Sequence, residues 1–269
     1  MRKVFLFFLF FSFISPVIFS QDTTFITTYY LGTDSVQTHT SCFSTCDSGI
    51  VFIQLHEDET TGIEAAKEYF MEYGGFLVQL KHSGERLLKF QIKNLEYTVD
   101  PNRIYTRDGL KNNLIKLKSY KPEPVMHLAR LAKQMLTSYI VNKKLVVALH
   151  NNTENKFSIL SYKKGMSEAV NAAKVFINNE MDPDDFILTT DTSIYRRIME
   201  KNINVVLQSK KAKDDGSLSV YAQLNKIPYI NIEAQHGHIK EQGEMLFAIK
   251  DIIAGYYDII ELNYLDNNK

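Results

Sequence analysis

The sequence predicts a single α/β domain whose sheet is mostly parallel at its centre. Two short apolar runs, 51–55 and 145–150, have the uninterrupted hydrophobicity of strands that are buried on both faces. Further strand-like runs alternate with segments of helical periodicity, as is typical of a parallel sheet covered by helices. No low-complexity linker or internal repeat divides the chain, which favours one domain.

The remaining elements are predicted from periodicity and from turn residues. The pattern Thr61-Gly-Ile-Glu64 is typical of a capping box and predicts a helix just after the first buried run. Residues 86–92 alternate between apolar and polar, so we expect an edge strand with one face in water. The other expected strands are 75–80, 186–190, 203–207 and 229–232. The other expected helices are 125–139, 166–178, 193–201 and about 241–262, and a charged loop is expected over 210–217.

The first 20 residues have the pattern of a targeting segment. Arg2 and Lys3 precede an apolar run over 4–11, and the sequence turns polar at Gln21. We therefore predict a secretory signal peptide over 1–20, with a retained membrane anchor as the alternative. Position 21 is not a cysteine that could carry a lipid, and no later stretch is long and apolar enough to span a bilayer. The expected location is secreted or periplasmic.

The charge balance argues against nucleic acid as a partner. The chain has 31 basic and 31 acidic residues. Removing residues 1–20 takes away two basic residues and no acidic ones, so 29 basic residues (31 − 2) and 31 acidic residues remain over positions 21–269. A mature domain so close to neutral has no electrostatic basis for binding nucleic acid or an anionic membrane.

The chain has two cysteines, Cys42 and Cys46, which lie just before the first buried run. In an oxidising compartment they would form a small disulfide loop, and two free thiols are the alternative. A zinc knuckle is disfavoured, because the spacing is four residues and no histidine lies nearby.

Histidine follows each of the two most buried strands. His56 and Glu59 come directly after the first strand, and His150 ends the second. The carboxyl ends of neighbouring parallel strands meet at one edge of a sheet, so these three side chains can converge there. Two imidazoles and a carboxylate suit a catalytic zinc site, which needs three protein ligands and leaves one position for water. A hydrogen-bonded structural role is the alternative for each histidine.

Three further polar residues have chemistry that suits a substrate site. Arg103 offers a planar fork to a carboxylate and Asn102 an additional neutral hydrogen bond, although Arg103 could instead pair with a structural aspartate such as Asp100. Glu233 ends a late strand, where a carboxylate can act as general base and acid. His236 and His238 have a spacing that could bind metal, but loop hydrogen bonding or substrate contact is preferred. The sequence has no nucleophile elbow, P-loop or dinucleotide fingerprint.

The order of these motifs resembles the zinc carboxypeptidase superfamily, which includes the succinylglutamate desuccinylase and aspartoacylase branch. The resemblance covers roughly residues 48–240. It implies a mixed sheet of about eight strands between helices, and one zinc ion per chain. The implied ligands are His56, Glu59 and His150. The implied substrate contacts are Asn102 and Arg103, with Glu233 as the catalytic acid and base.

The sequence departs from that family pattern in two places. Family members usually have another arginine shortly before Asn-Arg to stabilise the oxyanion, but residues 93–99 contain none. Arg86, Lys89 or Lys93 could substitute for it, or zinc alone could bear that charge. We choose Tyr221 as the tyrosine that covers the substrate, with a core aromatic role as the alternative.

These observations together predict an exported zinc hydrolase that cleaves a peptide or amide bond adjacent to a free carboxylate. Small peptides, including cell-wall peptides, are the expected substrates. One alternative is a deacylase of small N-acyl amino acids. The other is a non-catalytic binding protein with the same fold, which the missing arginine favours.

Overall fold

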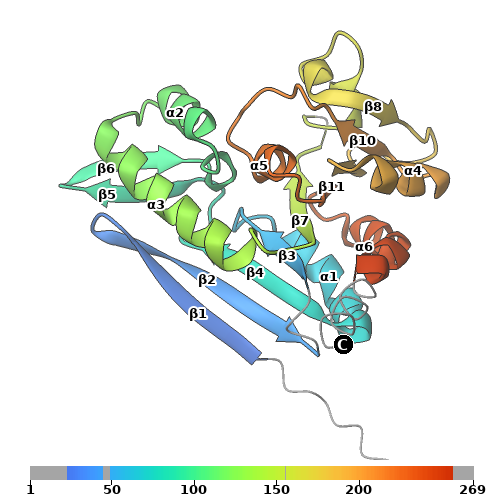
Figure 1. The fold of residues 1–269 in the computed structure, drawn as a ribbon, viewed down its shortest axis with the longest axis horizontal. Helices are drawn as coiled ribbons and strands as arrows, with labels where there is room; N and C mark the ends of the chain where they lie inside the picture. Colours follow the sequence, from blue (N-terminus) through green and yellow to red (C-terminus); the bar gives the residue numbers. More distant parts are fainter. Residues whose placement is uncertain (1–22, 45–48, 155, 257–269) are drawn as a thin grey trace, which may run out of the picture.

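The computed structural model describes residues 23–44, 49–154 and 156–256 (Figure 1). The predicted signal peptide over 1–20 lies outside the described residues, and so does Cys46. The export signal and the disulfide therefore stay predictions. Across the described ranges, no helix combines the length and the apolar character that crossing a bilayer requires.

A nine-stranded mixed sheet forms the centre of the described structure and confirms the predicted fold class. The strand order is β1-β2-β4-β3-β7-β11-β9-β10-β8. The four middle strands β4, β3, β7 and β11 run parallel, whereas β1, β2, β9 and β8 each pair antiparallel with a neighbour. The strands are β1 (Thr23–Leu31), β2 (Asp34–Phe43), β3 (Ile50–Gln54), β4 (Gly75–Lys81), β7 (Leu145–Asn152), β8 (Ala172–Phe176), β9 (Phe186–Thr189), β10 (Val205–Gln208) and β11 (Tyr229–Gln235).

Helices cover both faces of this sheet (Figure 1). Helices α1, α4 and α6 pack on one face, and α2, α3 and α5 pack on the other together with the small β5–β6 sheet. The α-helices are α1 (Thr60–Tyr73), α2 (Arg107–Lys116), α3 (Pro122–Tyr139), α4 (Thr192–Glu200), α5 (Leu218–Leu224) and α6 (Ile239–Ala248). The small sheet is β5 (Leu88–Ile92) with β6 (Leu95–Val99), and the 3-10 turns are η1 (Pro101–Arg103), η2 (Ile159–Tyr162) and η3 (Ala169–Asn171).

Strand β3 shows why the first apolar run is buried on both faces. Successive side chains of a strand point to opposite faces, so Val51 and Ile53 join the core under α3, whereas Ile50 and Phe52 join the core under α1. Phe52 meets Phe70 of α1 edge to face, with ring centroids 4.9 Å apart. Such a pair adds about 0.5–1.5 kcal/mol beyond the burial of the two rings.

The parallel register brings the ends of three strands to one edge of the sheet. Strand β7 lies between β3 and β11, and His150 of β7 pairs with Glu233 of β11. His56 comes after the end of β3, the other neighbour of β7. The predicted convergence at the carboxyl ends of parallel strands is therefore observed.

Two segments differ from the sequence prediction. Residues 166–178 do not form a helix, because 172–176 make an edge strand that pairs antiparallel with β10. The hydrogen bonds that 172–176 form with the distant strand β10 outweigh the local helix propensity of the alanines. Residues 88–92 alternate between buried and exposed as expected, but they pair with 95–99 in a separate sheet instead of lying at the edge of the main one.

The C-terminal helix is interrupted rather than continuous. Helix α6 spans Ile239–Ala248 and is capped at Ile249, after which 250–256 are again helical. The predicted range of about 241–262 ran through this break, and its last residues lie outside the described part of the chain.

Substitution of Leu128 provides a test of the packing in the core under α3. Its side chain is fully buried, whereas Met126 of the same helix is 64% exposed. Replacing Leu128 by Ala should lower the free energy of unfolding by about 2–5 kcal/mol, because it leaves a cavity in a packed core. Met126→Ala is the matched control and should change it by less than about 0.5 kcal/mol. Urea unfolding followed by circular dichroism measures both, and equal effects would contradict this packing.

Candidate metal centre

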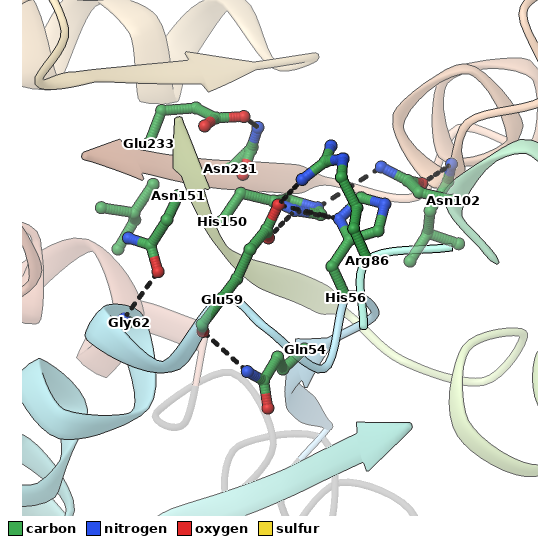
Figure 2. Close-up of polar contacts among 12 residues, drawn as sticks. Gln54, His56, Glu59, Gly62, Arg86, Asn102, His150, Asn151, Asn231 and Glu233 are labelled. Atoms are coloured by element: carbon green, nitrogen blue, oxygen red, sulfur yellow. Dashed lines mark hydrogen bonds and ion pairs between the residues drawn. The ribbon is translucent and has the colours of Figure 1, made fainter. Parts of the chain in front are cut away.

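Three buried side chains converge at the carboxyl edge of the sheet, two from the turn between β3 and α1 and one from β7 (Figure 2). One ligand atom from each of His56, Glu59 and His150 lies within 4.8 Å of the others. Nδ1 of His56 lies 2.9 Å from Oε1 of Glu59, and Nδ1 of His150 lies 2.7 Å from Oε2 of the same carboxylate. The two Nδ1 atoms are 3.3 Å apart. All three side chains therefore direct a metal-binding atom at one point.

The turn between β3 and α1 sets the position of Glu59. Gln54 donates from Nε2 to the main-chain oxygen of Glu59 at 2.7 Å. The helix begins at Thr60, with Glu59 as its N-cap but without a side-chain capping bond, because the carboxylate is directed to the histidines. The predicted capping box is therefore wrong, and Oγ1 of Thr61 instead accepts the N–H of Gly237 at 3.0 Å.

Asp100 orients the imidazole of His56. Its Oδ1 lies 2.8 Å from Nε2 of His56 and also accepts the backbone N–H of Asn102 at 2.8 Å. A proton on Nε2 directed to Asp100 leaves the lone pair of His56 on Nδ1, the atom that faces Glu59. Burial alone would lower the pKa of His56, but the Glu59 and Asp100 carboxylates outweigh it and raise this pKa to about 9. Burial opposes ionisation of Asp100, yet His56 and Arg103 hold its pKa below the usual range.

The donor set fits a divalent transition metal such as zinc. Two imidazole nitrogens and one carboxylate are a ligand set of catalytic zinc sites, and a second carboxylate behind one histidine is their common outer contact. Burial would raise the pKa of Glu59, but His150 and His56 hold it well below its usual range, so the carboxylate is ionised. His150 would bind metal through Nδ1, the atom that lies 2.7 Å from Oε2 of Glu59.

Arg86 also reaches the centre. From the sequence it was one of three candidates to replace the arginine that the family pattern places shortly before Asn-Arg. Its guanidinium pairs with Glu59 although the side chain is 46% exposed. The loop that carries it is held by Glu57, whose Oε2 accepts the backbone N–H groups of His82, Ser83 and Gly84 at 2.6, 2.9 and 2.8 Å. Arg86, one of the replacements considered from the sequence for the missing arginine, therefore lies beside the candidate ligands.

The centre opens into a polar pocket of about 420 Å³. His56, His150, Asn102, Arg103 and Glu233 all line it. The structure thus brings together every predicted site residue except Tyr221, with Glu59 buried beneath the two histidines.

Arg103 is held beside the pocket by two contacts. Its guanidinium donates to the main-chain oxygen of Asn102 at 2.8 Å, and its Nε lies 3.4 Å from Oδ2 of Asp215. The alternative of an ion pair with an aspartate is therefore observed, with Asp215 as the partner instead of Asp100. The Asn102 side chain is also fixed, since its Oδ1 accepts the N–H of Leu218 at 3.0 Å.

Glu233 is buried at the wall of the pocket next to His150. Oε1 accepts a hydrogen bond from Nδ2 of Asn231 at 3.0 Å (Figure 2). Burial raises the pKa of Glu233 above its ordinary value. A carboxylate in this state takes up a proton more readily than one in water.

The structure does not bring Tyr221 to the pocket, which corrects the prediction of a substrate-covering tyrosine. Ser219 and Val220 of α5 line the pocket, whereas Tyr221 lines a separate apolar cavity of about 270 Å³ beside Leu136. Each residue turns by about 100° around a helix, so neighbours on α5 cannot all face one side. Tyr221 therefore has the alternative role, packing against the core.

The two late histidines have different positions. His236 lines the pocket. Nδ1 of His238 lies 2.9 Å from Oδ2 of Asp185, in line with the loop hydrogen bonding preferred from the sequence. Among the described residues, His56, Glu59 and His150 are the group whose ligand atoms lie close enough to hold a metal ion.

Comparisons with known proteins find similarity among solved structures. No family model matches the sequence, and no curated protein matches it. The similar structures come from proteins assigned as metallopeptidases and from the succinylglutamate desuccinylase and aspartoacylase group, the proteins that the sequence resembles.

Three of these structures illustrate the range of sequence identity and coverage. A protein of Shewanella baltica OS155, provisionally described as a metallopeptidase, is 9% identical with a TM-score of 0.42 over 88% of this chain and 86% of that one. A succinylglutamate desuccinylase of Vibrio parahaemolyticus is 12% identical with a TM-score of 0.42 over 86% and 78%. An aspartoacylase family protein of Mesorhizobium loti is 13% identical with a TM-score of 0.40 over 88% and 68%.

Asp100 provides a test of the metal centre that does not depend on activity. Asp100→Asn should weaken zinc binding by about 10- to 100-fold, because His56 loses the carboxylate that orients it and raises its basicity. Competition with a chromophoric chelator measures the affinity. Asp108→Asn, an exposed change on α2, is the control and should bind zinc like the wild type. Equal affinity in both variants would rule out this role for Asp100.

Proposed function

We propose that the protein is an exported, zinc-dependent hydrolase that cleaves an amide bond adjacent to a free carboxylate. The observation that supports this proposal is one pocket lined by an arginine, a buried glutamate and the two histidines of a three-residue group that could hold a metal ion. His56, Glu59 and His150 would hold the ion. A zinc ion bound there would polarise the scissile carbonyl and make a water molecule nucleophilic near neutral pH.

Arg103 would receive the carboxylate of the substrate. Its guanidinium lies at the pocket wall and is already oriented through the main-chain oxygen of Asn102 and through Asp215. A planar fork that is fixed in advance loses little entropy when it binds a carboxylate. Asn102 supports this arrangement and lines the pocket next to His150.

Arg86 would supply positive charge where the carbonyl oxygen becomes negative. It lines the pocket and contacts Glu59, so its guanidinium lies beside the candidate ligands although the side chain is partly exposed. Preorganised donors of this kind contribute strongly to transition-state stabilisation. The absence of an arginine from 93–99 had favoured a non-catalytic binding protein. That argument loses its basis if Arg86 supplies the missing positive charge.

Glu233 would carry the proton between the two halves of the reaction. Its carboxylate accepts a proton from the attacking water and then donates it to the nitrogen of the leaving group. The raised pKa of Glu233, caused by its burial, favours this cycle because it makes the carboxylate a stronger proton acceptor. Asn231 orients the carboxylate through its bond to Oε1.

Substrate size distinguishes two versions of this function. A pocket of about 420 Å³ suits a small substrate, and this favours the deacylase of N-acyl amino acids as a second candidate beside peptide cleavage. Both reactions use the same carboxylate contact and the same amide chemistry. Hydrolysis of acyl amino acids without hydrolysis of peptides would select the deacylase.

Metal content tests the centre directly. We expect about one zinc per mature chain in the wild type, and loss of that zinc in His56→Ala and in His150→Ala, since each variant removes one of three ligands. Elemental analysis of folded, purified protein gives the answer. His127→Ala, a half-buried position near the start of α3, should retain zinc. A wild-type protein that binds no zinc after supplementation would exclude the hydrolase mechanism.

Glu233→Gln separates proton transfer from metal binding. The variant should keep its zinc but lose about 10²- to 10⁴-fold in kcat, because an amide cannot accept and return the proton. Turnover of a confirmed substrate is the measurement, and Glu200→Gln on the surface of α4 should match the wild type. A normal rate for Glu233→Gln would show that another group moves the proton.

A further inference from the structure

A second cavity lies apart from the candidate metal centre, on the face of the sheet that carries α2, α3 and α5 (Figure 1). Its volume is about 270 Å³, and it shares no lining residue with the polar pocket. None of its residues has a part in the proposed hydrolysis. A hollow formed between three helices is a common place for a small ligand, so this cavity is a candidate for a second binding site.

The lining of this cavity is mostly apolar. Nine of its thirteen lining residues are aliphatic or aromatic, and α3 contributes several of them at intervals of three or four positions, on one side of the helix. The residues of this α3 stripe are Val125, Ala129, Ala132 and Leu136. The cavity opens to solvent beside Val141, which also lines it and is 49% exposed. A hydrocarbon group can therefore enter from water and be buried there.

The charged residues at this cavity have one sign. Arg107 and Lys133 line it, and no acidic side chain of the described residues does. Both cations are exposed, and neither side chain forms an ion pair or a hydrogen bond with the residues that the structure describes. Asp108 follows Arg107, and Asp214 accepts a hydrogen bond from Thr106, but neither carboxylate lines the cavity. The mouth of the cavity thus offers two cations to an anionic group.

The surface around this mouth is also basic. Residues 107–133 contain seven basic and two acidic residues, whereas the whole chain is balanced at 31 and 31. All seven basic side chains are exposed. A local excess of this kind raises the concentration of anions near the surface. Charge therefore favours an anionic ligand over a neutral or cationic one.

The size of the cavity favours a small ligand over a protein partner. A cavity of about 150 Å³ with an aliphatic lining is large enough to bind benzene. A cavity of about 270 Å³ can hold an alkyl chain of several carbons. A stable protein interface buries about 1,200–2,000 Å², far more than a cavity of thirteen residues provides.

We propose that this cavity binds a single-chain carboxylate amphiphile, such as a medium-chain fatty acid. The hydrocarbon chain packs along the α3 stripe, and the carboxylate pairs with Arg107 and Lys133 at the mouth. The inference does not depend on the proposed function, because the two pockets share no residue.

Calorimetric titration of the purified protein with decanoate, below its micelle concentration, tests this site. We expect one decanoate per chain. 1-Decanol and decyltrimethylammonium carry the same chain on a neutral and a cationic head group, and should bind roughly 2- to 25-fold more weakly because two exposed ion pairs are lost. Octanoate should bind up to about 15-fold more weakly than decanoate, because it buries two methylene groups fewer.

A cavity-filling variant locates the bound chain. Ala129 is exposed on α3, so Ala129→Trp fills the cavity without disturbing the buried core and should lower the affinity for decanoate and 1-decanol at least about tenfold. Gln134→Trp places the same side chain at an exposed position of α3 outside the cavity and should bind both like the wild type. Thermal unfolding is recorded for each variant.

A double variant tests the head group. Arg107→Ala combined with Lys133→Ala should lower the affinity for decanoate roughly 2- to 25-fold and leave that for 1-decanol unchanged. Lys116→Ala combined with Lys118→Ala removes the same charge from exposed positions that do not line the cavity, and should keep the preference for decanoate.

Several results would overturn the site. They are the absence of saturable decanoate binding, equal or tighter binding of decyltrimethylammonium, and unchanged decanoate binding in Ala129→Trp. Adsorption to phosphatidylglycerol vesicles without binding of free decanoate would also overturn it, and would assign the basic surface to a membrane instead. None of these measurements involves hydrolysis, so their failure would leave the proposed function untouched.

Discussion

The buried charge of Glu59 is the constraint on which the rest of the site depends. A carboxylate that is 1% exposed is stable in ionised form only if cationic or hydrogen-bonding groups surround it. His56, His150 and Arg86 supply these contacts from three separate segments. Their positions are set by the sheet, because β3 and β7 are neighbours in parallel and end at the same edge. The sheet topology that defines the fold thus also places the residues of the candidate metal centre.

Much of this arrangement was predictable because it depends on local patterns. Buried strands read as short apolar runs, and parallel strands place their carboxyl-terminal residues at one edge, so His56, His150 and Glu233 could be grouped from the sequence. Arg86 and Asp100 could not be assigned, since their contacts depend on how a distant loop folds back. The strand over 172–176 was missed for the same reason: its hydrogen-bond partner is β10, and nothing in its own residues specifies that.

A polar network behind the ligands makes the site rigid. Gln242 of α6 donates to the main-chain oxygen of His150 at 3.0 Å and accepts from Asn151 at 2.8 Å. Asn151 in turn accepts the N–H of Gly62 in the first turn of α1 at 3.2 Å. Two helices are thereby tied to the strand that carries a ligand. Buried and mutually satisfied amides of this kind fix a single arrangement, which a metal centre and a substrate pocket both require.

The short turn after β3 links two parts of the site mechanically. Glu59 is a member of the ligand set, and Glu57, two residues earlier, holds the loop that carries Arg86. Any displacement of this turn carries the carboxylate and the anchor of the guanidinium in the same direction. The spacing between them is therefore set by two residues of backbone, and an insertion between positions 57 and 59 would change it. Sequence length in this turn is under tighter constraint than side-chain identity on the surrounding surface.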